Sequence, residues 1–383
     1  MKIVIAPDSF KESLTSLEVA AEIETGLKRV WPDATYVKVP MADGGEGTVR
    51  SLVDATGGEI VKVEVSGPMG DKVLASYGLL GDKRTAVIEM AEASGLPLVP
   101  RDKRNPLVAT TYGTGELIKD AIARGVEEII LGIGGSATND GGAGLAQALG
   151  VRFINFGGAL IPDLIAGGDL DDVQAVDMSQ VEPGLARVRI SVACDVTNPL
   201  CGETGASRVY GPQKGATPEM VAQLDRNLEH FAHVIKRSIG ADVADRPGAG
   251  AGGGIGAGLM AFTNATLKRG IDLVVEATRL EEHMRGAQLA VTGEGRIDAQ
   301  TPFGKTPAGV AAAARKQNVP VVAIAGGLSE DAPAVFAHGI DGLEAATAAP
   351  MSLDEAMAKA RENLQNAGER IARLIVVGQR MAR

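Results

Sequence analysis

The sequence predicts an α/β fold of two domains, in which a parallel-sheet domain built from both ends of the chain is split by an inserted mixed-sheet α/β domain. Three observations lead to this fold class. The 383 residues suffice for two compact domains. Strand-like apolar runs alternate with helical stripes at both ends of the chain, as in parallel sheets that helices cover on both faces. The middle of the chain carries period-two strands instead.

The N-terminal end predicts a strand, a helix and a second strand. Residues 3–5 and 36–39 are β-type runs, and a helical stripe lies between them. Thr15 and Glu18 have the spacing of a capping box at the start of that stripe. The short apolar run before Ala-Pro-Asp lacks the features of a signal peptide, so we expect residues 1–10 to open the fold.

The C-terminal third repeats the same alternation. Strand-like runs at 287–295, 319–327 and 343–350 alternate with helical patterns at 306–318 and 353–374. We expect these strands to join the N-terminal ones in a single parallel sheet.

The middle of the chain predicts antiparallel pairing. Residues 60–80 alternate with period two around a Gly-Pro-Met-Gly turn, and residues 85–90 and 190–196 follow as strands. Residues 247–258, PGAGAGGGIGAG, are the nearest approach to a linker.

The domain boundaries follow from these elements. One opening strand-helix-strand unit is too short to form a layer alone, so it needs the C-terminal third as a partner. We therefore predict a discontinuous domain of residues 1–65 plus 285–383 and an inserted domain of residues 66–284.

Composition narrows the function classes. The formal charge of −10 and the small aromatic content, with one Trp, four Tyr and seven Phe, argue against nucleic acid and anionic membranes as partners. Cys194 and Cys201 match neither a redox motif nor a zinc site. A cytoplasmic protein that binds small molecules is the expectation.

Four glycine-rich segments, at 43–48, 132–144, 248–258 and 292–298, combine glycine with carboxylates or hydroxyls. Three of them follow a predicted strand and precede a helical pattern, where helix N-termini bind anions. Seven carboxylates are expected in loops at strand ends: Asp8, Asp43, Glu46, Asp140, Asp195, Glu294 and Asp298. Such acids repel a phosphate unless a divalent cation lies between them, which predicts Mg²⁺.

Two familiar phosphate motifs fit poorly. Residues 248–253 satisfy GxGxxG, but DVADRP precedes them in place of a strand, which argues against a nicotinamide-dependent dehydrogenase. Residues 299–306 follow the Walker A pattern except that Ala299 replaces its first glycine. Lys305, just before Pro307 at a predicted helix start, can still direct its ammonium group at a phosphate.

Six ordered motifs now point to one family. They are APDSFKESL, ADGGEGT, GGSATNDGGAG, CDVTNPLCGETGAS, GPQKGA and TGEGRIDAQTPFGKTP. Over its full length the chain resembles the bacterial type I glycerate kinases, with one visible departure: Glu12 stands where the family usually has glycine. The resemblance implies ATP- and Mg²⁺-dependent phosphorylation of D-glycerate to 2-phosphoglycerate, and a flavodoxin-like domain split by an inserted domain with the active site in the cleft between them.

Together the resemblance and the residue patterns give expected roles. Asp195, which ends an apolar strand, is the expected base, with Asp298 as second choice. The other residues expected in catalysis are Lys11 and Lys214. The expected ATP contacts are Gly134, Gly135, Ser136, Thr138, Asn139 and Lys305. The expected glycerate contacts are Asp8, Ser9, Arg296 and Asn198. The expected magnesium ligands are Asp298, Asp43 and Glu46.

Alternatives remain open at this point. The product can be 3-phosphoglycerate, or the acceptor can be a related small hydroxy acid. In a different class, the chain can be a metabolite-binding protein without catalysis. The sequence also leaves a homodimer open as the assembly state.

Overall fold

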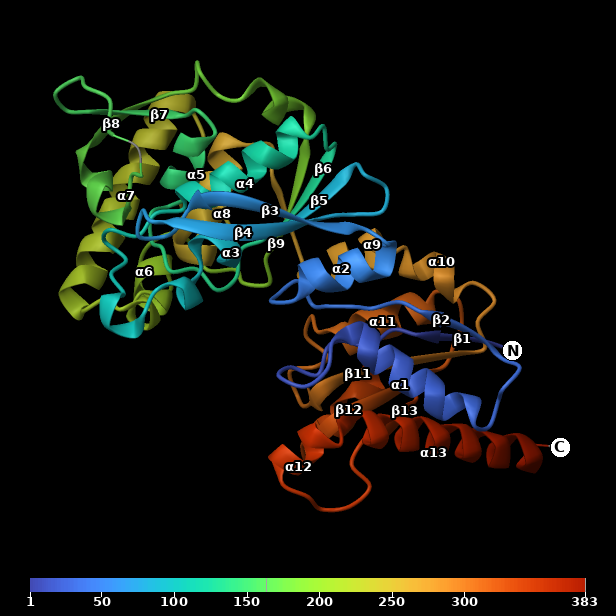
Figure 1. The fold of residues 1–383 in the computed structure, drawn as a ribbon. Coiled ribbons are helices and arrows are strands. Elements are labelled where there is room, and N and C mark those ends of the chain that lie inside the picture. Colours follow the sequence, from blue (N-terminus) through green and yellow to red (C-terminus); the bar gives the residue numbers. More distant parts are fainter. Residues whose placement is uncertain (163, 383) are drawn as a thin grey trace. The chain divides into compact units, whose positions relative to one another are not determined.

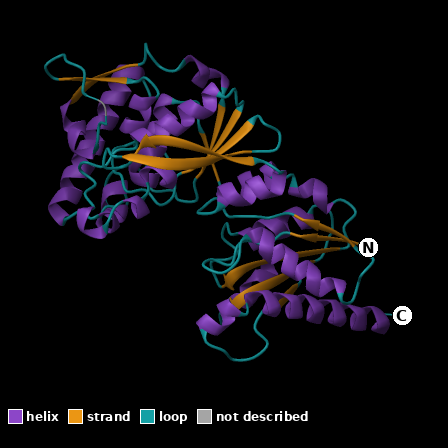
Figure 2. Ribbon diagram, in the orientation of Figure 1, coloured by secondary structure: helices purple, strands orange, loops and turns teal. Residues whose placement is uncertain are grey.

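The computed structural model describes residues 1–162 and 164–382. The chain divides into two compact units, Met1–Gly57 with Gly270–Arg383 (unit 1) and Gly58–Arg269 (unit 2). In each unit, helices surround a sheet (Figure 2). These boundaries differ from the predicted 65 and 285. Strand β3 pairs along its whole length with β4 and so belongs to unit 2, whereas helices α9 and α10 contact α11 and belong to unit 1.

Unit 1 contains a five-stranded sheet in which every pairing is parallel (Figure 1). Its strands are β1 (Lys2–Ile5), β2 (Thr35–Lys38), β11 (Leu289–Ile297), β12 (Val321–Leu328) and β13 (Gly342–Ala345). They lie in the order β2-β1-β11-β12-β13, which is the strand order of flavodoxin-like sheets. The predicted fold class of this part is confirmed.

Helices cover the sheet of unit 1. They are α1 (Ser16–Lys28), α2 (Thr48–Thr56), α9 (Gly270–Ala277), α10 (Leu280–Met284), α11 (Thr306–Arg315), α12 (Leu353–Ala358) and α13 (Ala360–Met381), with a 3₁₀ segment at Ala332–His338. Apolar residues of α1 and α13 form one core with Ile3, Ile5 and Val291 of the strands. The capping box of Thr15 and Glu18 is confirmed at the start of α1.

The C-terminal helix that the sequence predicts as one is divided into two helices in the structure. The pattern at 353–374 predicts a single helix, but the chain forms α12 and α13 with Lys359 between them at φ −101°. The break occurs because α13 packs along α1 while α12 is a separate short helix with its own Ser352 cap.

Unit 2 contains a six-stranded mixed sheet of order β10-β9-β6-β5-β4-β3. Its strands are β3 (Glu59–Ser66), β4 (Lys72–Leu79), β5 (Thr85–Glu89), β6 (Glu128–Gly132), β9 (Arg189–Ala193) and β10 (Thr266–Lys268). Strands β3, β4 and β5 pair antiparallel and the remaining pairs are parallel, so the predicted hairpin and mixed sheet are confirmed. A separate antiparallel pair consists of β7 (Arg152–Asn155) and β8 (Val173–Asp177).

The helices of unit 2 include a buried glycine-rich one. They are α3 (Ala91–Ser94), α4 (Tyr112–Ala123), α5 (Ala143–Ala148), α6 (Ala206–Tyr210), α7 (Pro218–Ile239) and α8 (Ala251–Phe262), with 3₁₀ segments at Leu96–Leu98, Arg101–Lys103, Gly167–Asp172, Pro183–Arg187 and Pro212–Lys214. The linker-like reading of residues 247–258 is wrong. Most of α8 is buried in the core of unit 2, because its glycines allow the backbone of the 138–142 loop to come close.

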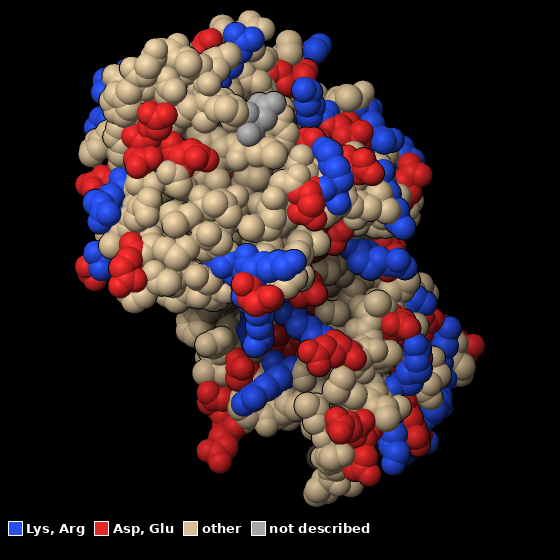
Figure 3. Space-filling model, turned by 60° about the vertical axis from the view of Figure 1, so that its left-hand side comes forward, with Lys and Arg blue, Asp and Glu red and all other residues tan. Residues whose placement is uncertain are grey.

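The surface mixes both signs of charge. Figure 3 shows Lys and Arg side chains (blue) beside Asp and Glu side chains (red) on the face in view. Exposed ion pairs occur on the surface of the protein, such as Lys83 with Glu59 at 2.7 Å. Among the described residues, no helix has the length and apolar character needed to cross a membrane.

Candidate active site

A charged pocket of about 330 Å³ lies in unit 1 beside the carboxyl end of β1. Its lining residues, which define the charged pocket below, are Asp8, Ser9, Lys11, Asp43, Glu294, Gly295, Arg296 and Lys305. Strand β1 pairs with β11 only as far as Val291, whereas β11 continues beside β12 to Ile297. The pocket therefore lies where the strand order reverses, the usual ligand position in such sheets.

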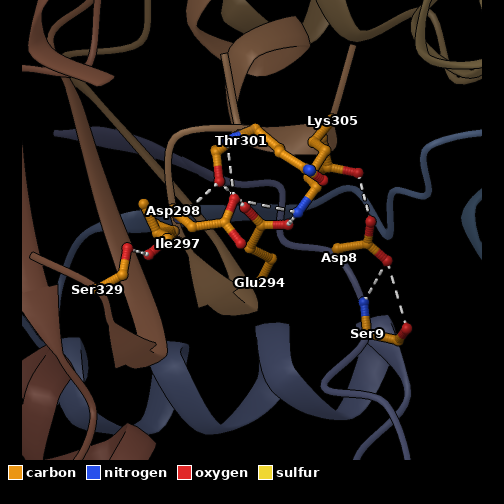
Figure 4. Close-up of polar contacts among 10 residues, drawn as sticks. Asp8, Ser9, Glu294, Ile297, Asp298, Thr301, Lys305 and Ser329 are labelled. Carbon is orange, nitrogen blue, oxygen red and sulfur yellow. Dashed lines mark hydrogen bonds and ion pairs between the residues drawn. The ribbon is translucent and has the colours of Figure 1, made fainter. Parts of the chain in front are cut away.

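Asp8 is held at this position by two elements. Its carboxylate accepts hydrogen bonds from Thr306 Oγ1 at 2.5 Å, at the start of α11, and from the backbone N–H of Ser9 at 2.6 Å (Figure 4). Burial and, to a smaller extent, the nearby charge of Asp43 raise the pKa of Asp8 to about 6, against the opposing effect of the hydrogen bonds from Thr306 and Ser9. Asp8 thus titrates close to neutral pH.

Glu294 is the most deeply buried carboxylate of the pocket. It is 8% exposed, and its Oε1 accepts a hydrogen bond from Thr301 Oγ1 at 2.6 Å. Burial raises the pKa of Glu294 to about 7, against the opposing effects of Thr301 and of the Lys305 ammonium group. The Nζ of Lys305 lies 4.0 Å from Glu294 Oε2 and 3.6 Å from Asp298 Oδ1. A cation and two carboxylates therefore meet at this wall, as Figure 4 shows.

Most residues predicted for binding in unit 1 come together here. Those that line the charged pocket are Asp8, Ser9, Lys11, Asp43, Arg296 and Lys305. Asp298 joins them through its ion pair with Lys305. Glu46 does not line the pocket and is exposed in the turn before α2. In the part of the chain that the structure describes, no three His, Cys, Asp or Glu side chains are grouped to hold a metal, so Asp43, Glu46 and Asp298 do not form such a set.

One part of the loop prediction is wrong. Glu294 lies within β11 and not in a loop after it. Strand β11 continues through the Gly-Glu-Gly segment because β12 also continues, pairing Glu294 with Ala325 and Arg296 with Gly327.

The predicted phosphate loop of unit 2 follows β6. Gly134 and Gly135 are exposed in it, whereas Ser136, Thr138 and Asn139 are buried. Asn139 Nδ2 donates to Ser207 Oγ at 2.9 Å, and the buried Thr138 Oγ1 and Asn139 Oδ1 have no hydrogen-bond partner among the described residues. In this structure the loop therefore offers its two exposed glycines to a ligand.

Lys214, which the sequence analysis expected to act in catalysis, is buried beside the loop after β6. It is 2% exposed, and its Nζ donates to Ser136 Oγ and to the carbonyl of Thr138, both at 2.6 Å. Burial lowers the pKa of Lys214 to about 7, and the charge of Asp140 opposes this shift. A Cβ on Gly253 of α8 would lie 2.8 Å from this Nζ and 2.0 Å from the Thr138 carbonyl oxygen, so glycine is required there. The two hydrogen bonds from the buried Lys214 ammonium group hold this part of the loop in place.

Asp140 is a structural carboxylate rather than one that faces a ligand. It is completely buried, and it accepts hydrogen bonds from Thr111 N and Oγ1 at 2.8 and 2.7 Å and from Gly142 N and Gly144 N at 3.1 and 3.2 Å. These bonds fix the turn into α5.

Replacing Asp140 by asparagine should lower the free energy of unfolding by about 2–4 kcal/mol, because the new amide group would face N–H donors in a buried place. Urea unfolding measures this change. The matched variant Asp102→Asn, at an exposed position, should stay within about 0.5 kcal/mol of the parent. An equal effect of both substitutions would contradict the structural role.

The segment after β9 holds the remaining predicted residues. Asp195 is exposed there. Asn198 has both ends of its amide engaged, since Nδ2 donates to the Thr204 carbonyl and Oδ1 accepts from Tyr210 OH, each at 2.8 Å. The structure thus leaves Asp195 accessible and makes Asn198 part of the local loop framework.

Comparison with known proteins now decides the family. Residues 3–376 match the sequence profile of the glycerate kinase family. The chain belongs to that family. It is 57% identical over 370 residues to a glycerate kinase of Halalkalibacterium halodurans, with 97% of each chain covered. It is 53% identical over 382 residues to the glycerate 2-kinase of Escherichia coli, with 100% of each covered.

A solved structure agrees with this membership in the glycerate kinase family. The crystal structure of a candidate glycerate kinase 2 from Salmonella typhimurium LT2 superposes with a TM-score of 0.91 at 52% identity, covering 99% of both chains. The resemblance inferred from the six motifs is confirmed.

The departure of this glycerate kinase family member at Glu12 has a structural cost. Glu12 has φ +62°, so it keeps the left-handed backbone that a glycine adopts freely. Glu12→Gly should raise the free energy of unfolding by about 0.5–1 kcal/mol, since the relieved strain exceeds the added entropy of the unfolded chain. Thermal or urea unfolding checks this, and Glu12→Ala, which keeps the strain, should give no gain. A loss of stability in Glu12→Gly would refute the strain argument.

Sequence reasoning missed three residues that build the charged pocket of this family member. It noted Glu294 as an acid but gave it no role, and it did not single out Thr301 or Thr306, whose hydroxyls hold Glu294 and Asp8. The only available signal was their place around Lys305 in the AQTPFGKTP segment.

Proposed function

We propose that the protein transfers the terminal phosphoryl group of ATP to a hydroxyl group of D-glycerate, with Mg²⁺, and forms 2-phosphoglycerate. The observation that carries the proposal is the charged pocket, where Lys11, Arg296 and Lys305 line one space with the buried Glu294 and the partly buried Asp8 at the switch point of a parallel sheet. Relatives named glycerate kinase and glycerate 2-kinase across nearly their whole lengths support the same reaction.

The cations suit phosphoryl transfer. The transferred group passes through a loose transition state whose charge spreads over its oxygens, so positioning and charge neutralisation dominate catalysis. Lys11, Arg296 and Lys305 are the groups proposed to neutralise this charge and the carboxylate of glycerate. Asp8 and Ser9 are proposed to orient the glycerate hydroxyls.

Two acids, one in the charged pocket and one beside it, are proposed to hold a magnesium ion. Mg²⁺ prefers carboxylate oxygens and is usually held by one or two of them together with substrate phosphates. Asp298 and Asp43 are the proposed ligands, while the exposed Glu46 is the weakest candidate of the predicted three. When bound, the ion supplies positive charge against the phosphates of ATP.

The reaction also needs a proton acceptor. As the glycerate oxygen bonds to phosphorus and the bond to the ADP oxygen breaks, the hydroxyl proton passes to a carboxylate. Asp195 remains the proposed base because it is accessible at the end of β9. Glu294 is the alternative that its pKa of about 7 favours, since an effective base has a pKa near the working pH.

The loop after β6 is proposed to contact phosphate through the backbone N–H groups of Gly134 and Gly135. Ser136, Thr138, Asn139 and Lys214 are proposed to hold this loop in place, because their polar groups are buried. The two free cysteines are compatible with the proposed cytoplasmic location.

Ligand-induced stabilisation tests the proposed class of function. ATP with Mg²⁺ should raise the melting temperature, and NADH should leave it unchanged, because only bound ligands stabilise the folded state. Stabilisation by NADH would favour a dehydrogenase. Stabilisation by glycerate alone, with no response to ATP, would favour a metabolite-binding protein without catalysis.

A further inference from the structure

A second pocket of about 360 Å³ adjoins the charged pocket in unit 1. The two pockets share Lys11, Gly295 and Arg296 among their lining residues, so they are continuous. Away from these shared residues, much of the second pocket is lined by hydrocarbon, with Phe10, Leu353, Ala356, Met357 and Ala360 as its side-chain walls. We call it the apolar pocket.

A few polar groups interrupt this lining. Ser13 Oγ is buried and has no hydrogen-bond partner among the described residues. Asn363 also lines the pocket, and its Nδ2 donates to the Met351 sulfur at 3.7 Å, which is a weak acceptor. Apolar walls with a small number of polar groups are typical of small-molecule and cofactor sites.

We propose that the apolar pocket binds the adenine ring of ATP, with the triphosphate passing Lys11 and Arg296 into the charged pocket. This inference rests on the proposed function, which names two substrates. Glycerate is polar throughout and has no group suited to hydrocarbon walls, whereas the nucleobase has two apolar faces and polar edges. The Asn363 amide, whose Nδ2 donates to a weak sulfur acceptor, is the polar group offered to a ring nitrogen at such an edge.

The sizes of the two pockets support the same assignment. Small-molecule sites usually measure about 300–1,000 Å³. At about 330 and 360 Å³, each pocket is near the lower limit. A ligand as large as ATP therefore needs both, and its own division into an apolar base and an anionic chain matches the division of the pockets.

A larger side chain at Gly327 can fill the apolar pocket. It lines the pocket from β12, its φ lies outside the left-handed region, and a Cβ built on it meets nothing within 4 Å. A leucine there should enter the open space without straining the backbone. Gly378 on α13 is a matched control in the same unit, because it is exposed and a Cβ on it also meets nothing within 4 Å.

Calorimetric titration of the full chain tests the assignment with two probes, Mg²⁺-ATP and Mg²⁺ with inorganic triphosphate, which lacks the base. Gly327→Leu should weaken ATP binding at least about tenfold and change triphosphate binding by less than about twofold. Gly378→Leu should bind both like the parent. Met357→Glu, which puts a charge in the same pocket from a partly exposed position, should repeat the ATP-specific loss if Gly327→Leu does not fold.

Two results would overturn the inference: unchanged ATP affinity in the folded variants, or equal losses for ATP and triphosphate. A parent protein that binds triphosphate as tightly as ATP would also overturn it. Formation of phosphoglycerate by the parent is measured separately. If the parent forms the product while the pocket variants keep their ATP affinity, the proposed function stands and only the adenine assignment fails. If the parent binds ATP more tightly than triphosphate and the pocket variants lose ATP affinity, but the parent forms no product, the adenine assignment stands and the proposed function fails.

Discussion

Lys305→Met should lower kcat by about 100- to 1,000-fold, the usual effect of removing one group that stabilises charge in a transition state. The Lys305 side chain is only 30% exposed, and its Nζ lies between Asp298 and Glu294 in the charged pocket. The KM for ATP should change less than kcat if this ammonium group acts mainly on the transferring phosphoryl group. Steady-state kinetics at saturating glycerate measures both constants.

The matched control is Lys316→Met, which changes the same residue type at the other end of α11. Lys316 is 61% exposed and pairs with Glu281 outside the pocket, so its replacement should leave kcat unchanged. A second measurement separates a catalytic from a structural effect. The charge of Lys305 lowers the pKa of Glu294, so its removal should move the titration of Glu294 to higher pH. A normal kcat in Lys305→Met would mean that this lysine only starts the helix.

Glu294→Gln should stabilise the protein above neutral pH while it impairs catalysis. Burial raises the folded-state pKa of Glu294 to about 7 from an ordinary value of 4.5. Between these two pH values the unfolded chain is ionised there and the folded chain keeps its proton, so stability falls as pH rises through this window. Glutamine cannot ionise, and Thr301 Oγ1 can still donate to its carbonyl oxygen.

The expected gain for Glu294→Gln at pH 8 is about 1–3 kcal/mol, and it should shrink toward zero near pH 5. Asp8, whose pKa is also raised, adds a loss of the same sign between pH 3.8 and 6 in both proteins. Urea unfolding at several pH values measures the difference, with Glu64→Gln on the exposed side of β3 as the control. A gain that does not depend on pH would contradict the assigned titration. Activity should fall about 100-fold or more if Glu294 takes up the hydroxyl proton, and far less if Asp195 does.

The parallel sheet of unit 1 could be predicted because its central strands are short apolar runs between helical stripes, a pattern set by burial on both faces. Strand pairing beyond these apolar runs could not be predicted from the sequence. Residues 292–295 read both as the end of a strand-like run and as a glycine-rich loop, because Gly-Glu-Gly-Arg has low strand propensity, and its pairing with β12 makes it a strand. That extension places Glu294 in the pocket.

The candidate site, like the fold, could be predicted from the sequence only in part. Arg296 and Lys305 could be predicted to bind anions because they follow glycines near a strand end and a helix start, whereas Lys11 is expected from the family resemblance and the need for cations. The burial of Lys214 could not be predicted, since it depends on Ser136 and on Gly253, which are distant in sequence. Glycine alone does not reveal whether a ligand or another part of the chain approaches it. Residues 138–142 and 252–258 use much of their glycine to pack against each other.

We infer that this chain phosphorylates D-glycerate at its 2-hydroxyl with ATP. A phosphorus NMR spectrum of the purified protein with ATP, Mg²⁺ and D-glycerate tests it most directly. We expect a new monoester resonance that matches 2-phosphoglycerate, together with ADP, and loss of both in Lys305→Met. A resonance of 3-phosphoglycerate would keep the kinase and contradict the assigned hydroxyl. Intact ATP with no monoester, from folded protein, would contradict the account.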